Sequence, residues 1–134
     1  MQRRLFLATM VAMPLAAILA IPIASAAERK TFDAAAFEAA QQQGARILVD
    51  IWASWCPTCR AQKPIIDHLA EQPANSDLVI FAVDFDSQKP VVRRFGAQRQ
   101  STLIAFRGRT ETGRSVGDTN PSSIAALVQS TLTK

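Results

Sequence analysis

The chain has 134 residues, of which 49% are apolar and 19% charged, and it contains two cysteines and one histidine. This length suits one domain of ordinary size and leaves no room for a second core of comparable size. The balance of apolar and charged residues excludes a wholly disordered chain. Two cysteines cannot build a disulfide framework, and with one histidine they cannot fill a four-ligand structural zinc site within one chain.

The beginning of the chain has the pattern of an export signal. It opens with two consecutive arginines, continues with an apolar run and ends on the small residues Ala24, Ser25 and Ala26. This is the order of a cleavable signal, and the arginine pair also resembles a twin-arginine export signal. We therefore expect 1–26 to be a cleaved signal peptide, with an uncleaved membrane anchor as the alternative. We expect 27–134 to form the folded domain.

The charge of the expected mature domain gives no reason to expect a nucleic-acid partner. The whole chain carries 15 basic and 11 acidic side chains, and the signal contributes Arg3 and Arg4 to the basic ones. The remaining chain therefore has a net charge of +2, with no cluster of Lys and Arg interleaved with aromatic residues. Export would place this domain in an oxidising compartment such as a bacterial periplasm.

The first half of the domain predicts two helices around a buried strand. Asp33 is suited to cap a helix over 34–43. The nearly continuous apolar run over 47–53 is typical of a strand covered on both faces. A second helix is expected over 57–71, because it begins with a proline and carries a helical apolar stripe. Pro64 is expected to kink this helix.

The second half predicts the remaining strands of one sheet. An apolar run over 78–83 indicates another buried strand, and a short helix is expected over 89–96. A strand over 102–106 and an antiparallel return over 111–116 follow, separated by a turn. An apolar stripe over 121–132 predicts a final helix. The order α-β-α-β-α-β-β-α predicts an α/β fold with a central mixed sheet between helices.

Cys56 and Cys59 lie where the strand over 47–53 gives way to a helix. This spacing brings two sulfurs together across the first helical turn, and the exposed helix N-terminus favours a thiolate at Cys56. Such a thiolate can attack a disulfide of another protein, and Cys59 can then resolve the mixed disulfide. Pro57 fixes the turn between the cysteines, and Thr58 is placed to offer its hydroxyl to a sulfur.

The cysteine pair is also compatible with two roles other than disulfide exchange. The pair could form an inert structural disulfide, or it could hold a soft metal ion, because Cu(I) accepts two thiolates. His68 follows Cys59 by nine residues on the expected helix. We interpret it as a surface histidine, and no metal or other cofactor is part of the main interpretation.

The stretch LVDIWASWCPTC over 48–59 resembles the active-site segment of the thioredoxin family. Shorter matches follow at 83–86, 102–106 and 116–117, and the resemblance covers nearly all of 30–133. It implies a thioredoxin fold and the activity of a thiol:disulfide oxidoreductase.

The resemblance also implies roles for individual residues. Cys56 matches the attacking cysteine and Cys59 the resolving one, which form a redox-active disulfide when oxidised. Asp50 matches a buried carboxylate that takes up and returns the proton of the resolving thiol. The apolar strand around Asp50 independently predicts a raised pKa for this carboxyl, and a solvated aspartate at a sheet edge is the alternative. Trp52 and Trp55 match the aromatic pair that flanks the site, with Trp55 expected to border the sulfur.

Two positions depart from the family pattern. Ser101 precedes Thr102, where the family has a cis-proline in the loop that faces the disulfide and receives substrate backbone. A cis bond before serine would cost about 2.5–4 kcal/mol. We therefore expect a trans peptide, a reshaped loop, an added backbone N–H and a hydroxyl able to point at the sulfurs. Ala82 stands where many thioredoxins have a lysine, which predicts that Asp50 is harder to ionise.

The sequence thus predicts an exported thiol:disulfide oxidoreductase that reduces disulfides of client proteins in a periplasm. The resemblance implies a membrane thiol transporter of the cytochrome c biogenesis type as a candidate electron donor. One alternative reverses the direction and makes the protein a disulfide oxidase or isomerase. Periplasmic oxidases usually have a histidine in place of Thr58 and an inserted helical domain, so the short chain favours the reductase. A non-catalytic copper- or thiol-binding module is the other alternative.

Overall fold

The computed structural model describes residues 21, 23 and 25–133. Most of the expected signal peptide over 1–26 therefore lies outside the described residues, and its cleavage stays a prediction. In the part of the chain that is described, no helix has the length and apolar character needed to cross a membrane.

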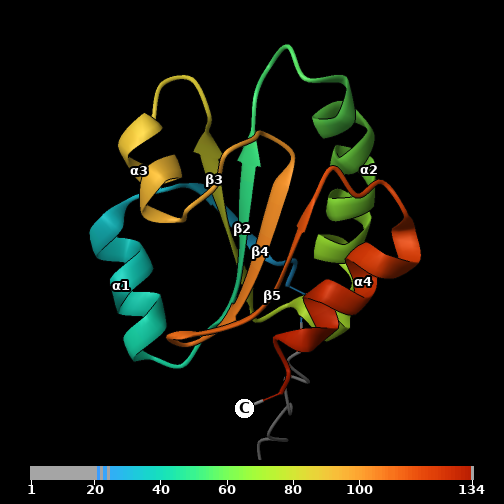
Figure 1. The fold of residues 1–134 in the computed structure, drawn as a ribbon. Coiled ribbons are helices and arrows are strands. Elements are labelled where there is room, and N and C mark those ends of the chain that lie inside the picture. Colours follow the sequence, from blue (N-terminus) through green and yellow to red (C-terminus); the bar gives the residue numbers. More distant parts are fainter. Residues whose placement is uncertain (1–20, 22, 24, 134) are drawn as a thin grey trace, which may run out of the picture.

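Five strands form a central mixed sheet. They are β1 (Glu28–Thr31), β2 (Arg46–Trp52), β3 (Leu78–Asp84), β4 (Thr102–Arg107) and β5 (Thr110–Val116). In space their order is β1-β3-β2-β4-β5. The strands β1, β3 and β2 run parallel, whereas β4 and β5 pair in antiparallel fashion. This arrangement places β2, which leads to the cysteines, at the centre of the sheet (Figure 1).

Helices cover both faces of the sheet (Figure 1). One face carries α1 (Ala34–Gln42) and α3 (Lys89–Arg94), and the other carries α2 (Pro57–Glu71) and α4 (Pro121–Ser130). A short 3-10 helix, η1 (Pro73–Asn75), follows α2. Every predicted helix and strand is present and in the predicted sequence order, and α2 continues through its internal proline.

Two elements, β1 and η1, are not predicted by the sequence pattern. Three of the four residues of β1 are charged, so the segment shows no alternation of apolar and polar side chains. The strand pairs with β3 along one edge only. Its extended conformation therefore depends on tertiary pairing, which overrides weak local preference.

Alternation of side chains along β2 divides the core into two layers. Ile47, Val49 and Ile51 join the layer that faces α1 and α3, which contains five buried phenylalanines. Leu48 belongs to the layer that faces α2 and α4, where the buried side chains are aliphatic. Asp50 lies between Val49 and Ile51 in the strand, so its side chain points to the opposite face. Its carboxyl therefore enters the aliphatic layer with Leu48.

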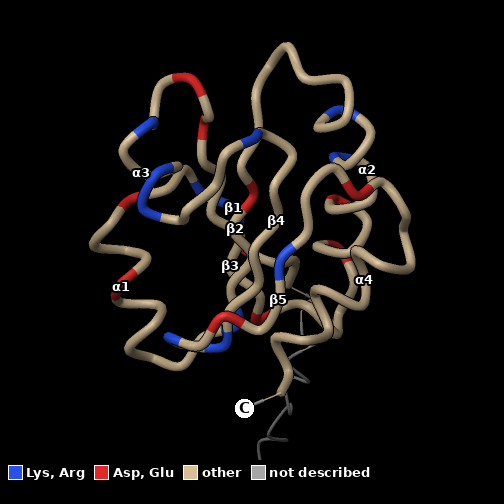
Figure 2. Tube along the Cα trace, viewed as in Figure 1, with Lys and Arg blue, Asp and Glu red and all other residues tan. Residues whose placement is uncertain are grey.

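Charged residues of both signs are interspersed along the helices and loops (Figure 2). The central strand β2 nevertheless buries two of them, Arg46 at 1% exposure and Asp50 at 6%. Burying a charge is costly unless partners satisfy it. The buried charge of each residue therefore needs polar or charged partners nearby.

Arg46 is satisfied by four groups at the end of the domain remote from the cysteines. Its Nε donates to Thr131 Oγ1 at 2.9 Å, and its Nη2 donates to Asn75 Oδ1 at 2.8 Å. Its Nη1 donates to the Ala74 carbonyl oxygen at 2.9 Å and to Asp77 Oδ1 at 2.6 Å. One guanidinium thus joins β2, η1 and the end of α4.

Candidate active site

The loop that carries the cysteines lies where three strands meet. β2 ends at Trp52, which is in register with Asp84 at the end of β3. Thr102, the first residue of β4, pairs with Ile51 next to that end. The carboxyl ends of two parallel strands and the beginning of β4 therefore surround the start of α2.

Cys56 is the N-cap of α2. Its backbone is extended, with φ −86° and ψ 111°, and its Sγ accepts a hydrogen bond from the Cys59 N–H at 3.1 Å. Pro57 occupies the first helical position, where its missing N–H costs nothing. A sulfur that caps a helix gains both this N–H and the helix dipole, which stabilise a thiolate.

Cys56 is more buried than predicted. Its exposure is 1%, compared with 9% for Cys59, so the expectation of an exposed sulfur is wrong. The two cysteines and Ala53 form a small cluster against which Trp52 and Phe85 pack. The cause is the capping geometry, because the side chain that reaches back to the Cys59 N–H turns away from solvent.

Cys59 has a thiol that is difficult to ionise. Burial raises its pKa to about 11, and a hydrogen bond with Cys56 adds to the increase. Backbone hydrogen bonding from Ala53 and Ser101 opposes the shift in part. A thiol with this pKa is protonated at neutral pH, so Cys59 requires a base before it can attack a disulfide.

Asp50 has the environment expected of such a base. Burial raises the pKa of its carboxyl above the usual value, which confirms the sequence prediction. The guanidinium of Arg29, 3.5 Å away, opposes this shift. The alternative of a solvated aspartate at the sheet edge is wrong, because Asp50 lies on the central strand at 6% exposure.

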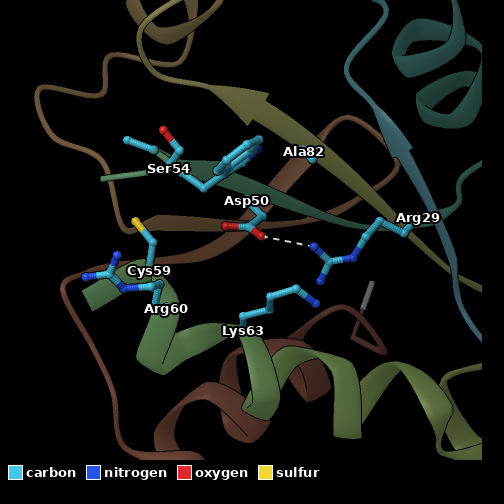
Figure 3. Close-up of a pocket in the computed structure, with 9 residues that line it drawn as sticks. Arg29, Asp50, Ser54, Cys59, Arg60, Lys63 and Ala82 are labelled. Atoms are coloured by element: carbon cyan, nitrogen blue, oxygen red, sulfur yellow. Dashed lines mark hydrogen bonds and ion pairs between the residues drawn. The ribbon is translucent and has the colours of Figure 1, made fainter. Parts of the chain in front are cut away.

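Asp50 and Cys59 line the same pocket of about 370 Å³. In Figure 3 the Asp50 carboxyl lies between Arg29 on one side and Cys59 on the other. Among the described side chains no hydrogen bond joins this carboxyl to the thiol directly. The pocket has room for water, which can bridge polar groups that do not touch.

Ser101 differs from its prediction in one respect. The described residues contain no cis peptide bond, so the trans prediction is confirmed, and Ser101 has a positive φ of 56°. Its hydroxyl donates to the Gln100 carbonyl oxygen at 2.6 Å, so the expectation of a hydroxyl pointing at the sulfurs is wrong. A short hydroxyl side chain readily bonds to adjacent backbone. The backbone amide of Ser101, rather than its hydroxyl, acts on Cys59.

The remaining predicted site residues make different contacts. Thr102 is buried, and its Oγ1 donates to the Arg99 carbonyl oxygen at 2.8 Å, which closes the loop before β4. Trp55 is 54% exposed, and its Nε1 donates to Asp86 Oδ2 at 2.7 Å. In the described chain, no hydrogen bond joins the Thr58 hydroxyl to a sulfur. Trp52 packs against the cysteines.

Comparison with known proteins identifies the family. The Thioredoxin family model matches residues 28–130. The chain belongs to the thioredoxin family. The crystal structure of Trxlp from Edwardsiella tarda EIB202 is 42% identical, covers 75% of this chain and 98% of its own, and superposes with a TM-score of 0.73.

More distant members of the family agree. A thioredoxin of Alicyclobacillus acidocaldarius is 34% identical over 88 residues, which are 65% of this chain and 82% of the relative. The thioredoxin structure from Malassezia sympodialis is 21% identical, covers 78% of this chain and 91% of its own, and has a TM-score of 0.67, which shows the fold alone. The chain is therefore a thioredoxin-type thiol:disulfide oxidoreductase with the thioredoxin fold.

Sequence reasoning missed two polar residues of this thioredoxin site. Gln62 is 1% exposed, and its Nε2 donates to the carbonyl oxygens of Asp118 at 2.8 Å and Ser101 at 3.3 Å. Its spacing of three from Cys59, on the buried stripe of α2, was an available signal. Arg29 had no such signal, because it lies on the missed strand β1.

The left-handed backbone at Ser101 leads to a prediction for the thioredoxin loop. We expect Ser101→Gly to raise stability by up to about 1 kcal/mol, because glycine adopts positive φ without steric cost. We expect Ser101→Pro to lower stability by more than about 1 kcal/mol, because proline fixes φ near −65°. Urea unfolding of both variants tests this. Equal midpoints for the two would contradict the conformation of the loop.

Proposed function

We propose that the protein reduces disulfide bonds of exported client proteins in a bacterial periplasm through a Cys56–Cys59 dithiol–disulfide cycle. The asymmetry between the two cysteines supports this proposal. The sulfur of Cys56 accepts an N–H at the start of α2, whereas burial raises the pKa of Cys59 to about 11. This difference favours Cys56 as the attacking group and Cys59 as the thiol that reacts second.

The proposed cycle begins at Cys56. Its thiolate attacks one sulfur of a client disulfide, forms a mixed disulfide and releases the other client sulfur as a thiolate, which takes up a proton. Asp50, as a carboxylate, then accepts the proton of Cys59 through water in the shared pocket. The Cys59 thiolate attacks the Cys56 sulfur, which releases the second client thiolate and leaves the Cys56–Cys59 disulfide.

The loops around the sulfurs would position the client. Ser101 and Thr102 would face the extended client backbone across from the cysteines, as the family resemblance implies. Trp55 is exposed beside the start of α2 and would supply an apolar contact. Pro57 and Thr58 would set the geometry of the turn between the sulfurs. These roles make client disulfides in extended segments the expected substrates.

Export is the second part of the proposal. It is supported by the arginine pair, the apolar run and the small residues that together make up 1–26. A reductase in an oxidising compartment needs an electron donor, for which we propose a membrane thiol transporter of the cytochrome c biogenesis type. Fractionation of cells that express the chain should place it in the periplasm, with Ala27 as its first residue.

The reduction potential of the Cys56–Cys59 couple distinguishes the reductase from the oxidase or isomerase. Equilibration with glutathione buffers followed by alkylation of free thiols measures this potential. We expect a value near that of thioredoxin, about −270 mV, together with reduction of insulin disulfides. A value of about −120 to −180 mV would instead indicate an oxidase or isomerase.

The copper-binding alternative would rest on the two thiolates alone. Within the described residues, no group of three His, Cys, Asp or Glu side chains is arranged to hold a metal ion. His68 is exposed and lies beside Gln72 on α2. A Cu(I) affinity no tighter than that of glutathione would remove this alternative.

A further inference from the structure

Asp50 has a charged partner that comes from the edge of the sheet. Arg29 on β1 places its Nη1 3.5 Å from Asp50 Oδ2. Its Nη2 lies 3.3 Å from Oδ1 of Asp67 on α2, and Lys63 pairs with the same Asp67 at 2.5 Å. Asp67 thus holds one end of the guanidinium while the other end faces the buried carboxyl.

The strand β3 lies between β1 and β2, and it leaves room for the contact between Arg29 and Asp50. Ala82 on β3 is in register with Asp50 on β2 and with Thr31 on β1. Its methyl group lines the pocket and supplies no charge. The long Arg29 side chain therefore reaches across β3 into the pocket, and Figure 3 shows it directed at Asp50.

We propose that Arg29 is the positioning residue that keeps the Asp50 carboxylate ionised and oriented toward the pocket shared with Cys59. This inference rests on the proton-accepting role proposed for Asp50. It assigns a function to the edge strand β1, whose remaining described contacts are structural. It also accounts for how a buried carboxyl gains a neighbouring cation in a chain that has alanine, and no lysine, at position 82.

The other groups around Asp50 cannot replace Arg29. The charged or titratable groups that face it come from two elements, and they are Arg29 on β1 and Cys59, Arg60, Lys63 and Asp67 on α2. Arg29 lowers the pKa of Asp50 more than Lys63 does, whereas Asp67 raises it. Lys63 is 67% exposed and already paired with Asp67, so solvent screens its charge.

The test compares Arg29→Gln with Lys30→Gln. Lys30 is the neighbouring cation on β1, but it pairs with Glu28 and lies over the Phe81 ring on the other face of the sheet. We expect Arg29→Gln to move the titration of the Asp50 carboxyl, followed by NMR, to higher pH. We expect it to slow insulin reduction at pH 7 about fivefold, as loss of an interaction worth about 1 kcal/mol would. Lys30→Gln should change neither.

Two further variants separate a charge effect from a structural one. Adding Ala82→Lys to Arg29→Gln should restore the rate and the titration, because it returns a cation to the pocket from β3. In the Asp50→Asn background, Arg29→Gln should cause no additional loss of rate. A structural role of Arg29 would give no restoration and an additive loss.

The inference is overturned if Arg29→Gln and Lys30→Gln give the same Asp50 titration and the same rate. Failure of the unsubstituted protein to reduce insulin would instead contradict the proposed function. In that case the NMR titration alone still decides whether Arg29 governs the ionisation of Asp50. The two failures are therefore distinguishable.

Discussion

Replacing Cys56 with serine should abolish disulfide reduction, whereas replacing Cys59 with serine should leave the protein trapped on its clients. Serine at position 56 has a hydroxyl that stays protonated at neutral pH, so no attack on the client disulfide occurs. With serine at position 59, the Cys56 thiolate still attacks. The mixed disulfide then persists, because no second thiolate is available to release it.

The two variants should behave alike in a turnover assay and oppositely in an adduct assay. Insulin turnover should fall to the uncatalysed rate in both variants. Non-reducing electrophoresis after incubation with oxidised proteins should show covalent adducts with Cys59→Ser and none with Cys56→Ser. The double serine variant is the matched control for non-specific adducts. Adducts formed by Cys56→Ser, or no adducts formed by Cys59→Ser, would contradict the order of attack.

Replacing Arg46 with methionine should cause a large loss of stability, although Arg46 lies at the end of the domain remote from the cysteines. Methionine fills similar volume but leaves buried acceptors on Asn75 and Thr131 without their donor. Loss of this network should cost about 3–5 kcal/mol. For a domain of this size, that loss lowers the melting temperature by about 12 °C or more.

Thermal and urea unfolding followed by circular dichroism measure this effect. Arg46→Lys keeps the charge but not the planar fork, so it should recover only part of the stability. Arg109→Met is the matched control, because Arg109 is exposed in the turn between β4 and β5. The network would be unimportant if Arg46→Met and Arg109→Met unfolded at the same temperature.

The sequence predicted the parts of the site that local pattern controls. The apolar run of β2 placed Asp50 in the core, and Pro57 after Cys56 placed the cysteine pair at a helix start. Both features depend on neighbours in the chain, so short-range preferences were sufficient.

The sequence could not predict contacts made across the fold. Arg29 reaches Asp50 because β1 pairs with β3, and a four-residue charged strand carries no local sign of that pairing. The enclosure of Cys56 likewise depends on Phe85, which follows β3 and packs against the cysteines. Such contacts are fixed only once the sheet has assembled.

The enclosure of Cys56 bears on how readily small oxidants reach its sulfur. Oxidation of a cysteine to sulfenic acid and beyond follows both thiolate character and solvent access. The 1% exposure of Cys56 restricts solvent access. Trp52 and Phe85 pack against the cluster that contains the two cysteines, so this packing must open before a peroxide can reach the sulfur. We therefore expect the reduced protein to resist oxidation by peroxide more than a cysteine exposed at a helix N-terminus would.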